Sequence, residues 1–236
     1  MNYSLSQAQR QWQARARAFA QDEMLPLSLQ RDAVADPFAA FDWDIIKKGS
    51  RLGFRTAVVG RQWGGHGIDF VTQALVMAEL AKADSAITKT FSQCWKWRHL
   101  IAEGCTDDQK ARFLTPFIED DTFLLGHAGT EPNAGSDHRL PPEEDPRAGW
   151  KLKAEQIDGR ADAGLGGHSI NNVLLMNFAA DVIQRVTRLN MDIHGGAGVS
   201  QMDSRVDKLS RDAIIWTHLA GDSVQRMKAV HRLKWN

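Results

Sequence analysis

A mostly α-helical fold is predicted by three observations along this chain of 236 residues. Apolar residues recur every three or four positions in both the N-terminal and C-terminal parts, which is the helical period. Helix-start signals precede several of these stretches. By contrast, one short segment alone, 150–154, has the character of a β-strand. Glycine and proline gather between the two helical parts, so we expect helical regions at 1–124 and 168–236, joined by a segment at 125–167.

The first helical region is expected to begin with a long amphipathic helix. Ser4 is a suitable N-cap, and proline disfavours helix at the residue before it, so the Leu25-Pro26 pair is expected to end this helix. The apolar stripe consists of Leu5, Ala8, Trp12, Ala16 and Phe19.

Four more helices are expected before residue 120. Three of them are predicted at 38–52, 70–81 and 85–101. The fourth begins at Thr106, because Thr106 and Gln109 have the spacing of a capping box. Residues 53–69 contain the sequence WGGHG and are predicted to form a loop.

Two helices are expected in the second helical region. The first has a regular stripe and ends at Gly195-Gly196, a typical C-cap. Its stripe consists of Leu175, Phe178, Val182, Val186, Leu189 and Ile193. The stripe of the second consists of Leu209, Ala213, Trp216, Leu219 and Val224.

Composition argues against several classes of protein. The 29 basic residues balance the 29 acidic ones, which argues against binding to nucleic acid. No apolar run has membrane-spanning length, so no membrane insertion is expected. The eight histidines are scattered and Cys94 and Cys105 are isolated, so no metal site is expected. The N-terminal residues lack an apolar signal region, and together with the two cysteines this predicts a cytoplasmic protein.

Two motifs in a fixed order carry information about function. TEPNAGSD occupies 130–137, and IHGGAGVSQ at 193–201 is followed by KLSRDA at 208–213. Within a mostly helical chain, this combination resembles the acyl-CoA dehydrogenase family. The resemblance extends over residues 5–152 and again from 171 to the end.

The resemblance implies an N-terminal helical domain, a middle β-domain and a C-terminal helical bundle, usually assembled as a homo-oligomer. It also implies that flavin adenine dinucleotide (FAD) accepts a hydride from an acyl-CoA substrate and that an electron-transferring flavoprotein reoxidises it. By the same resemblance, Thr130 would contact the flavin ring, and Gly135 and Ser136 would lie along the path of FAD and CoA. Gly195 and Gly196 would allow a helix end to approach the cofactor closely.

The sequence departs from the family pattern in two places. Only residues 138–170 are available for a β-domain and two bundle helices, so we expect the β-domain to be residual or absent. The glutamate that serves the family as catalytic base aligns with Ala220, and Asp222 is the nearest carboxylate. Because an alanine cannot accept a proton, we expect impaired dehydrogenation.

Two hypotheses follow. The chain is either an acyl-CoA dehydrogenase-like flavoprotein with a shortened β-domain, or a non-catalytic helical protein that acts by association with other proteins. Under the second hypothesis, loss of the intervening segment exposes apolar helix faces, which then need a partner. Stoichiometric flavin would distinguish the two.

Overall fold

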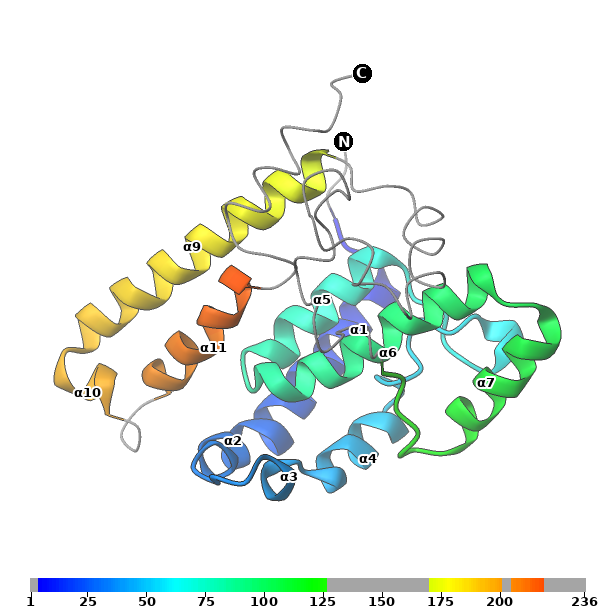
Figure 1. Ribbon diagram of the computed structural model, residues 1–236, viewed down its shortest axis with the longest axis horizontal. Coiled ribbons are helices and arrows are strands. Elements are labelled where there is room, and N and C mark those ends of the chain that lie inside the picture. Colours follow the sequence, from blue (N-terminus) through cyan, green and yellow to red (C-terminus); the bar gives the residue numbers. More distant parts are fainter. Residues whose placement is uncertain (1–3, 127–169, 201–204, 219–236) are drawn as a thin grey trace, which may run out of the picture. The chain divides into compact units, whose positions relative to one another are not determined.

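The computed structural model describes residues 4–126, 170–200 and 205–218 (Figure 1). These residues form helices and connecting loops, and none of them lies in a β-strand, which confirms the mostly α-helical prediction. The chain divides into two compact units, Met1–His127 and Ala128–Asn236. The strand predicted at 150–154 lies outside the described residues.

The first helix, α1 (Gln7–Phe19), begins two residues later than predicted. Its N-cap is Ser6, whose hydroxyl accepts a hydrogen bond from the Gln9 backbone N–H at 3.2 Å. The Gln9 side chain accepts one in return from the Ser6 N–H at 2.9 Å. The prediction of Ser4 was wrong: Ser4 and Ser6 both have a glutamine three residues later, and the capping box that forms is the one between Ser6 and Gln9.

The helix also continues through the proline that was expected to end it. The π-helix η1 (Ala20–Met24) leads directly into α2 (Leu25–Asp32). The Leu25 N–H donates to the Ala20 carbonyl, five residues back, and Pro26 lies in the first turn of the new α-helix. A missing N–H costs little there, so the prediction that this pair ends the helix was wrong.

The single helix predicted over 38–52 is two helices, α3 (Pro37–Ala40) and α4 (Trp43–Arg51). Asp42 has an extended backbone and caps α4. Its side chain accepts hydrogen bonds from the Asp44 and Ile45 backbone N–H groups. Phe38 is 90% exposed, and α4 buries Ile45 and Ile46 instead. Of the apolar residues at helical spacing in 38–52, Ile45 is therefore buried as expected, whereas Phe38 is not.

Residues 53–69 are irregular, as predicted, and contain the short 3-10 helix η2 (Arg61–Trp63). The start of this loop is nevertheless buried, because Phe54 to Val59 lie inside the core. The Trp95 indole N–H donates to the Phe54 carbonyl at 2.6 Å, which satisfies a backbone group inside the protein. The loop is part of the core rather than a surface connection.

Three further helices complete the N-terminal unit: α5 (Phe70–Ala81), α6 (Ser85–Gly104) and α7 (Asp107–Glu119). The capping box at the start of α7 is confirmed, with Thr106 and Gln109 bonded in both directions. Phe70, the first residue of the helix predicted at 70–81, is exposed although its apolar side chain follows the helical spacing. The buried residues of α5 are Thr72, Val76, Glu79 and Leu80.

The C-terminal unit contains α9 (Ile170–His194), the single turn α10 (Gly196–Val199) and α11 (Val206–His218). Helices α9 and α11 lie side by side, and both were predicted. Gly195 has a φ of 54°, which confirms the glycine end of α9. The continuation of the last helix beyond 218 lies outside the described residues. None of the helices searched within the described part is long and apolar enough to cross a membrane.

Candidate functional site

The structure describes two of the predicted cofactor-binding residues, Gly195 and Gly196. Thr130, Gly135 and Ser136 lie outside the described residues, and so do Ala220 and Asp222, which the sequence places at or near the base position. The roles of these five residues therefore remain predictions.

The turn at Gly195 and Gly196 presents bare backbone to its surroundings. The Gly195 N–H donates to the Asp192 carbonyl at 3.3 Å, which closes the end of α9. A Cβ added at either glycine would meet no atom of the described residues within 4 Å, and both glycines are exposed. A planar ring or a phosphate group can therefore approach this backbone without a side chain in its way, as the predicted role requires.

Gly198, in the same motif, has a different role. A Cβ at this position would lie 2.7 Å from the Met191 carbonyl oxygen, so glycine is needed for α10 to fold back on α9. His194 Nδ1 lies 2.8 Å from the Asn190 carbonyl, one turn back on the same helix. This contact supports the structural interpretation of His194 over a catalytic one.

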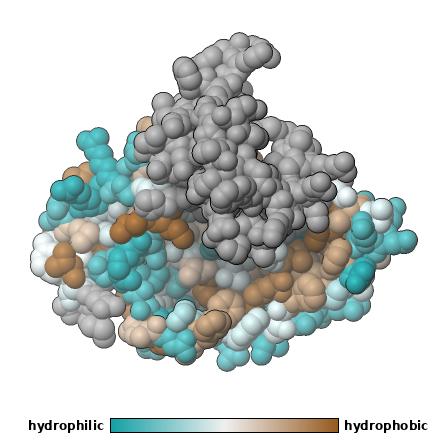
Figure 2. All heavy atoms as spheres, in the orientation of Figure 1, coloured by the Kyte–Doolittle hydropathy of each residue, from teal (hydrophilic) through white to brown (hydrophobic). Residues whose placement is uncertain are grey.

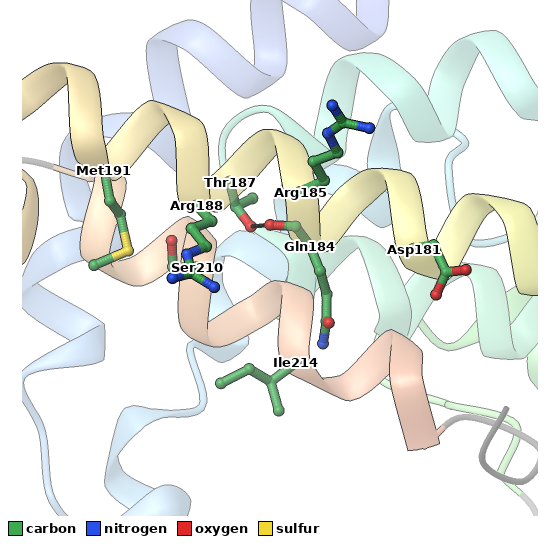
Figure 3. Close-up of a pocket in the computed structure, with 8 residues that line it drawn as sticks. All are labelled: Asp181, Gln184, Arg185, Thr187, Arg188, Met191, Ser210 and Ile214. Atoms are coloured by element: carbon green, nitrogen blue, oxygen red, sulfur yellow. Dashed lines mark hydrogen bonds between the residues drawn. The ribbon is translucent and has the colours of Figure 1, made fainter.

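An open groove of about 490 Å³ runs between α9 and α11 (Figure 3). It is lined by Asp181, Gln184, Arg185, Thr187, Arg188, Met191, Ser210 and Ile214. Gln184 points toward α11, whereas Arg185 extends to the opposite side of α9. The sequence did not reveal this groove, because its polar residues have the spacing of an ordinary solvated helix face.

The charged residues of the KLSRDA motif form ion pairs along α11, one within the motif and one with Asp207 just before it. Lys208 Nζ lies 2.8 Å from the Asp212 carboxylate, and Arg211 Nε lies 2.9 Å from the Asp207 carboxylate. Both pairs have the four-residue spacing that stabilises helices. Ala213, at the end of the motif, is buried. Within the described residues, the motif therefore stabilises α11 through ion pairs and contributes Ala213 to its buried side.

In the N-terminal unit, a buried arginine organises the segment that leads toward residues 130–137. Arg55 is 1% exposed and donates to the backbone carbonyls of Phe117 and Phe123 and to the Ser50 hydroxyl. Its guanidinium carbon lies 4.6 Å from the centre of the Phe117 ring. Burial lowers the pKa of the Arg55 guanidinium from its ordinary value. Sequence reasoning missed this residue because it lies in a segment predicted to be a surface loop.

Two more contacts hold the same segment. Asp120 accepts hydrogen bonds from the Thr122 N–H at 2.8 Å and hydroxyl at 2.7 Å, and these bonds lower the pKa of the Asp120 carboxyl. The Leu125 N–H lies 3.5 Å from the Cys94 sulfur. The thiol pKa of Cys94 is raised by burial, so this cysteine behaves as a neutral packing residue. The chain therefore leaves the N-terminal core in a fixed conformation.

The most strongly shifted carboxyl group lies on α5. Glu79 is bound by Arg17 at 2.9 Å, Lys82 at 2.8 Å and Gln13 at 3.0 Å. The hydrogen bond from Arg17 is the largest cause of a pKa lowered to about 2. A carboxylate held ionised by two cations is a weak proton acceptor, so Glu79 joins α1 to α5 rather than acting as a base.

Among the residues that the structure describes, no three histidine, cysteine, aspartate or glutamate side chains gather where they could hold a metal ion.

Apolar residues are visible at the surface among polar ones (Figure 2). The exposed apolar residues of the C-terminal unit include Phe178, Val182, Val186, Leu189 and Ile193 of α9. These five belong to the stripe that predicted the helix.

Comparison with known proteins identifies the family. The model of the acyl-CoA dehydrogenase N-terminal domain matches residues 6–121, so the chain belongs to the acyl-CoA dehydrogenase family. The matched residues coincide with the helices of the N-terminal unit, from the Ser6 cap to the end of α7.

Individual relatives match about half of the chain. A mitochondrial isobutyryl-CoA dehydrogenase of Dictyostelium discoideum is 29% identical over 133 residues, which are 56% of this chain and 31% of the relative. A 3-(aryl)acrylate reductase of Clostridium sporogenes is 32% identical over 124 residues, 52% of this chain and 31% of the relative. The chain thus spans about a third of the length of the curated relatives it matches.

A solved structure supports the fold. Butyryl-CoA dehydrogenase from Megasphaera elsdenii superposes with a TM-score of 0.76 over 98% of this chain and 99% of that one. The two sequences are 17% identical over this alignment, a level at which the likeness shows the fold alone.

Proposed function

We propose that this chain is a flavoprotein of the acyl-CoA dehydrogenase type that binds FAD and an acyl-CoA thioester but dehydrogenates slowly. The observation that carries the proposal is the open backbone at Gly195 and Gly196, in a chain whose residues 6–121 match the family's N-terminal domain. In this proposal α9 presents a helix end that a cofactor can approach, and the N-terminal unit fixes the segment that leads to TEPNAGSD.

The donor set fits FAD. The turn at Gly195 and Gly196 offers exposed backbone, and the Thr130 and Ser136 hydroxyls would supply hydrogen bonds to the flavin ring and along the bound ligands. Gly135 would let the chain approach closely. Bound FAD supplies the acceptor for the hydride that leaves the β-carbon of the acyl chain.

The chain's own contribution to catalysis is reduced at the base position. The Ala220 methyl group cannot accept the α-proton of the thioester, and Asp222 is the nearest carboxylate in the sequence. A positioned general base typically contributes about 10²–10⁴-fold to the rate. The proposal is therefore a protein that binds its ligands and turns over slowly.

Further parts of the proposal concern the setting of the protein. An electron-transferring flavoprotein would reoxidise the flavin, as implied by the family resemblance, and fatty acid metabolism would supply the substrates. The free thiols of Cys94 and Cys105 favour a reducing, cytoplasmic location. We also infer a homo-oligomer, supported by the exposed apolar residues of α9.

The base assignment is tested by restoring the carboxylate. FAD-loaded wild-type protein and the Ala220→Glu variant are mixed with butyryl-CoA or isobutyryl-CoA, and bleaching of the flavin absorbance is followed in a stopped-flow instrument. We expect the variant to bleach about 10²-fold or more faster than wild type. Ala220→Gln is the matched control, because it adds similar volume without a base. Equal rates for all three proteins would reject Ala220 as the base position.

The second candidate function, association with other proteins without catalysis, is favoured by the same exposed stripe on α9. It predicts a folded protein that does not retain FAD. Retention of flavin in near-stoichiometric amount would eliminate it as the sole function.

A further inference from the structure

The groove between α9 and α11 has the size of a small-molecule site. Its volume of about 490 Å³ falls within the range of about 300–1,000 Å³ that is usual for ligand pockets. Both helices belong to the C-terminal unit and lie side by side. The lining residues of α9 end at Met191, before the turn at Gly195. The groove is therefore separate from the backbone proposed to approach the cofactor.

One buried polar atom of the groove has no partner. The Ser210 hydroxyl oxygen is shielded from solvent and makes no hydrogen bond with any residue that the structure describes. Burying a hydroxyl without a hydrogen bond costs free energy, so such groups are usually bonded to protein, water or ligand. Because Ser210 lines the groove, its hydroxyl is a hydrogen-bond donor that a bound ligand can use.

A cation lies at the same end of the groove. In Figure 3, Arg188 extends from α9 toward α11 at the level of Ser210. Lys208 and Arg211 of α11 each have a carboxylate partner, whereas Arg188 has none within the described part of the chain. A guanidinium and a hydroxyl are suitable donors for a carboxylate. Because Arg188 is exposed, its long side chain can turn to admit a carboxylate to the hydroxyl.

An opposite charge lies at the other end of the groove. Asp181 precedes Arg188 by seven residues, which is about 10 Å along a helix. Ile214 and Gln184 lie between the two charged ends, and Ile214 is 54% exposed (Figure 3). Asp181 also has no cationic partner among the described residues. It would repel a second anion and attract a cation, so the groove matches a ligand with opposite charges at its two ends.

We propose that the groove between α9 and α11 binds a linear zwitterion of the ω-amino acid class. Its carboxylate would be bound by Arg188 and Ser210, its hydrocarbon chain would cover Ile214, and its ammonium group would lie beside Asp181. The juxtaposition of a buried unpaired hydroxyl with two opposite charges on one side of α9 supports the proposal. It is independent of flavin binding and catalysis, because none of these residues belongs to the predicted cofactor-binding or base positions.

The test is a ligand-observed NMR titration of the full-length chain with 8-aminooctanoate, octanoate and octylamine at constant ionic strength. Octanoate lacks the ammonium group and octylamine lacks the carboxylate. We expect 8-aminooctanoate to bind about tenfold more tightly than octylamine, because the carboxylate makes charge-assisted hydrogen bonds. It should bind about threefold more tightly than octanoate, because an ion pair with the exposed Asp181 contributes less.

Two variants test the carboxylate end. Arg188→Gln should weaken binding of 8-aminooctanoate about tenfold, because it removes the cation. Ser210→Ala should weaken it about fivefold, because it removes the hydroxyl donor. Neither variant should change the affinity for octylamine, which has no carboxylate to lose. Unchanged octylamine binding also shows that the groove has kept its shape.

Asp181→Asn tests the ammonium end. It should weaken binding of 8-aminooctanoate about threefold and leave binding of octanoate unchanged, because octanoate has no ammonium group. Arg185→Gln is the matched control for Arg188→Gln. The charged end of Arg185 extends to the opposite side of α9, so this variant should bind all three probes as wild type does (Figure 3).

Three results would overturn the proposal. Wild type that binds none of the probes at millimolar concentration would leave the groove as a solvated surface. Equal affinities for the three probes would mean that neither charged end is recognised. Binding of 8-aminooctanoate that persists unchanged in Arg188→Gln and Ser210→Ala, both folded by circular dichroism, would place the ligand elsewhere.

Discussion

The two units of this chain use apolar helix faces in opposite ways. In the N-terminal unit, Phe54 and Phe91 are completely buried and belong to one core shared by α1, α4, α5 and α6. In the C-terminal unit, the regular stripe of α9 is mostly at the surface, and Leu189 is about half exposed. Apolar residues at the helical period therefore predict a helix. They predict a buried face only where a neighbouring element covers that face.

The difference also separates the kinds of function the two units can have. In the N-terminal unit, the buried side chains of Arg55 and Glu79 find their hydrogen-bond partners within the unit itself. The C-terminal unit presents an open glycine turn and an open helix face. Our proposals therefore place the binding of ligands and partners mainly on the C-terminal unit.

The largest expected effect compares one core residue with one stripe residue. Phe91→Ala should lower the free energy of unfolding by about 3–5 kcal/mol, because it removes a buried aromatic ring and leaves a cavity. Ile193→Ala, at protein concentrations where the chain is monomeric, should change it by less than about 0.5 kcal/mol, because the side chain is already in water. Urea denaturation of both variants measures the difference. Equal losses would contradict the contrast between the units.

A smaller effect is expected where the N-terminal core holds the segment after α7. Arg55→Met should lower the free energy of unfolding by about 1–3 kcal/mol, because the Phe117 and Phe123 carbonyls lose a buried donor. It should also speed amide hydrogen exchange at residues 120–125. Arg51→Met is the control: Arg51 bonds to Asp121 at the surface, and such a pair contributes about 1 kcal/mol or less. If both variants behave alike, Arg55 does not fix this segment.

The smallest effect concerns pH. The Glu79 pKa is held at about 2, below its ordinary value of 4.5, mainly by Arg17, so the ionised group stabilises the fold. This contribution is fully present above pH 4.5 and is lost as pH falls from about 4.5 toward 2. Glu79→Gln should therefore be less stable at neutral pH and lose less stability across that window. Thermal unfolding at a series of pH values measures this, and parallel curves for both proteins would reject the role of Glu79.

Much of the fold could be predicted from local signals. The capping box at Thr106 and the glycine end of α9 were read correctly, because both depend on residues close together in sequence. The prediction at Pro26 failed because a π-helical turn places the proline in the first turn of a new α-helix, where its missing N–H costs little. The buried loop at Phe54 was missed because burial depends on contacts from distant helices.

The candidate site was predictable to a smaller extent. Gly195 and Gly196 were identified by resemblance, and the structure adds that their backbone is open. The groove between α9 and α11 required a three-dimensional view, because each of its charged residues alone has the character of a solvated surface charge. Site residues that depend on packing between helices are not visible in a linear pattern.

The flavoprotein assignment is tested most directly by the visible absorbance spectrum of the purified chain after incubation with FAD and desalting. We expect a retained flavin band of about one FAD per chain, because in the proposed function the glycine turn and the TEPNAGSD residues bind the cofactor. A chain that is folded by circular dichroism but elutes without flavin would contradict the flavoprotein assignment and leave association as its function.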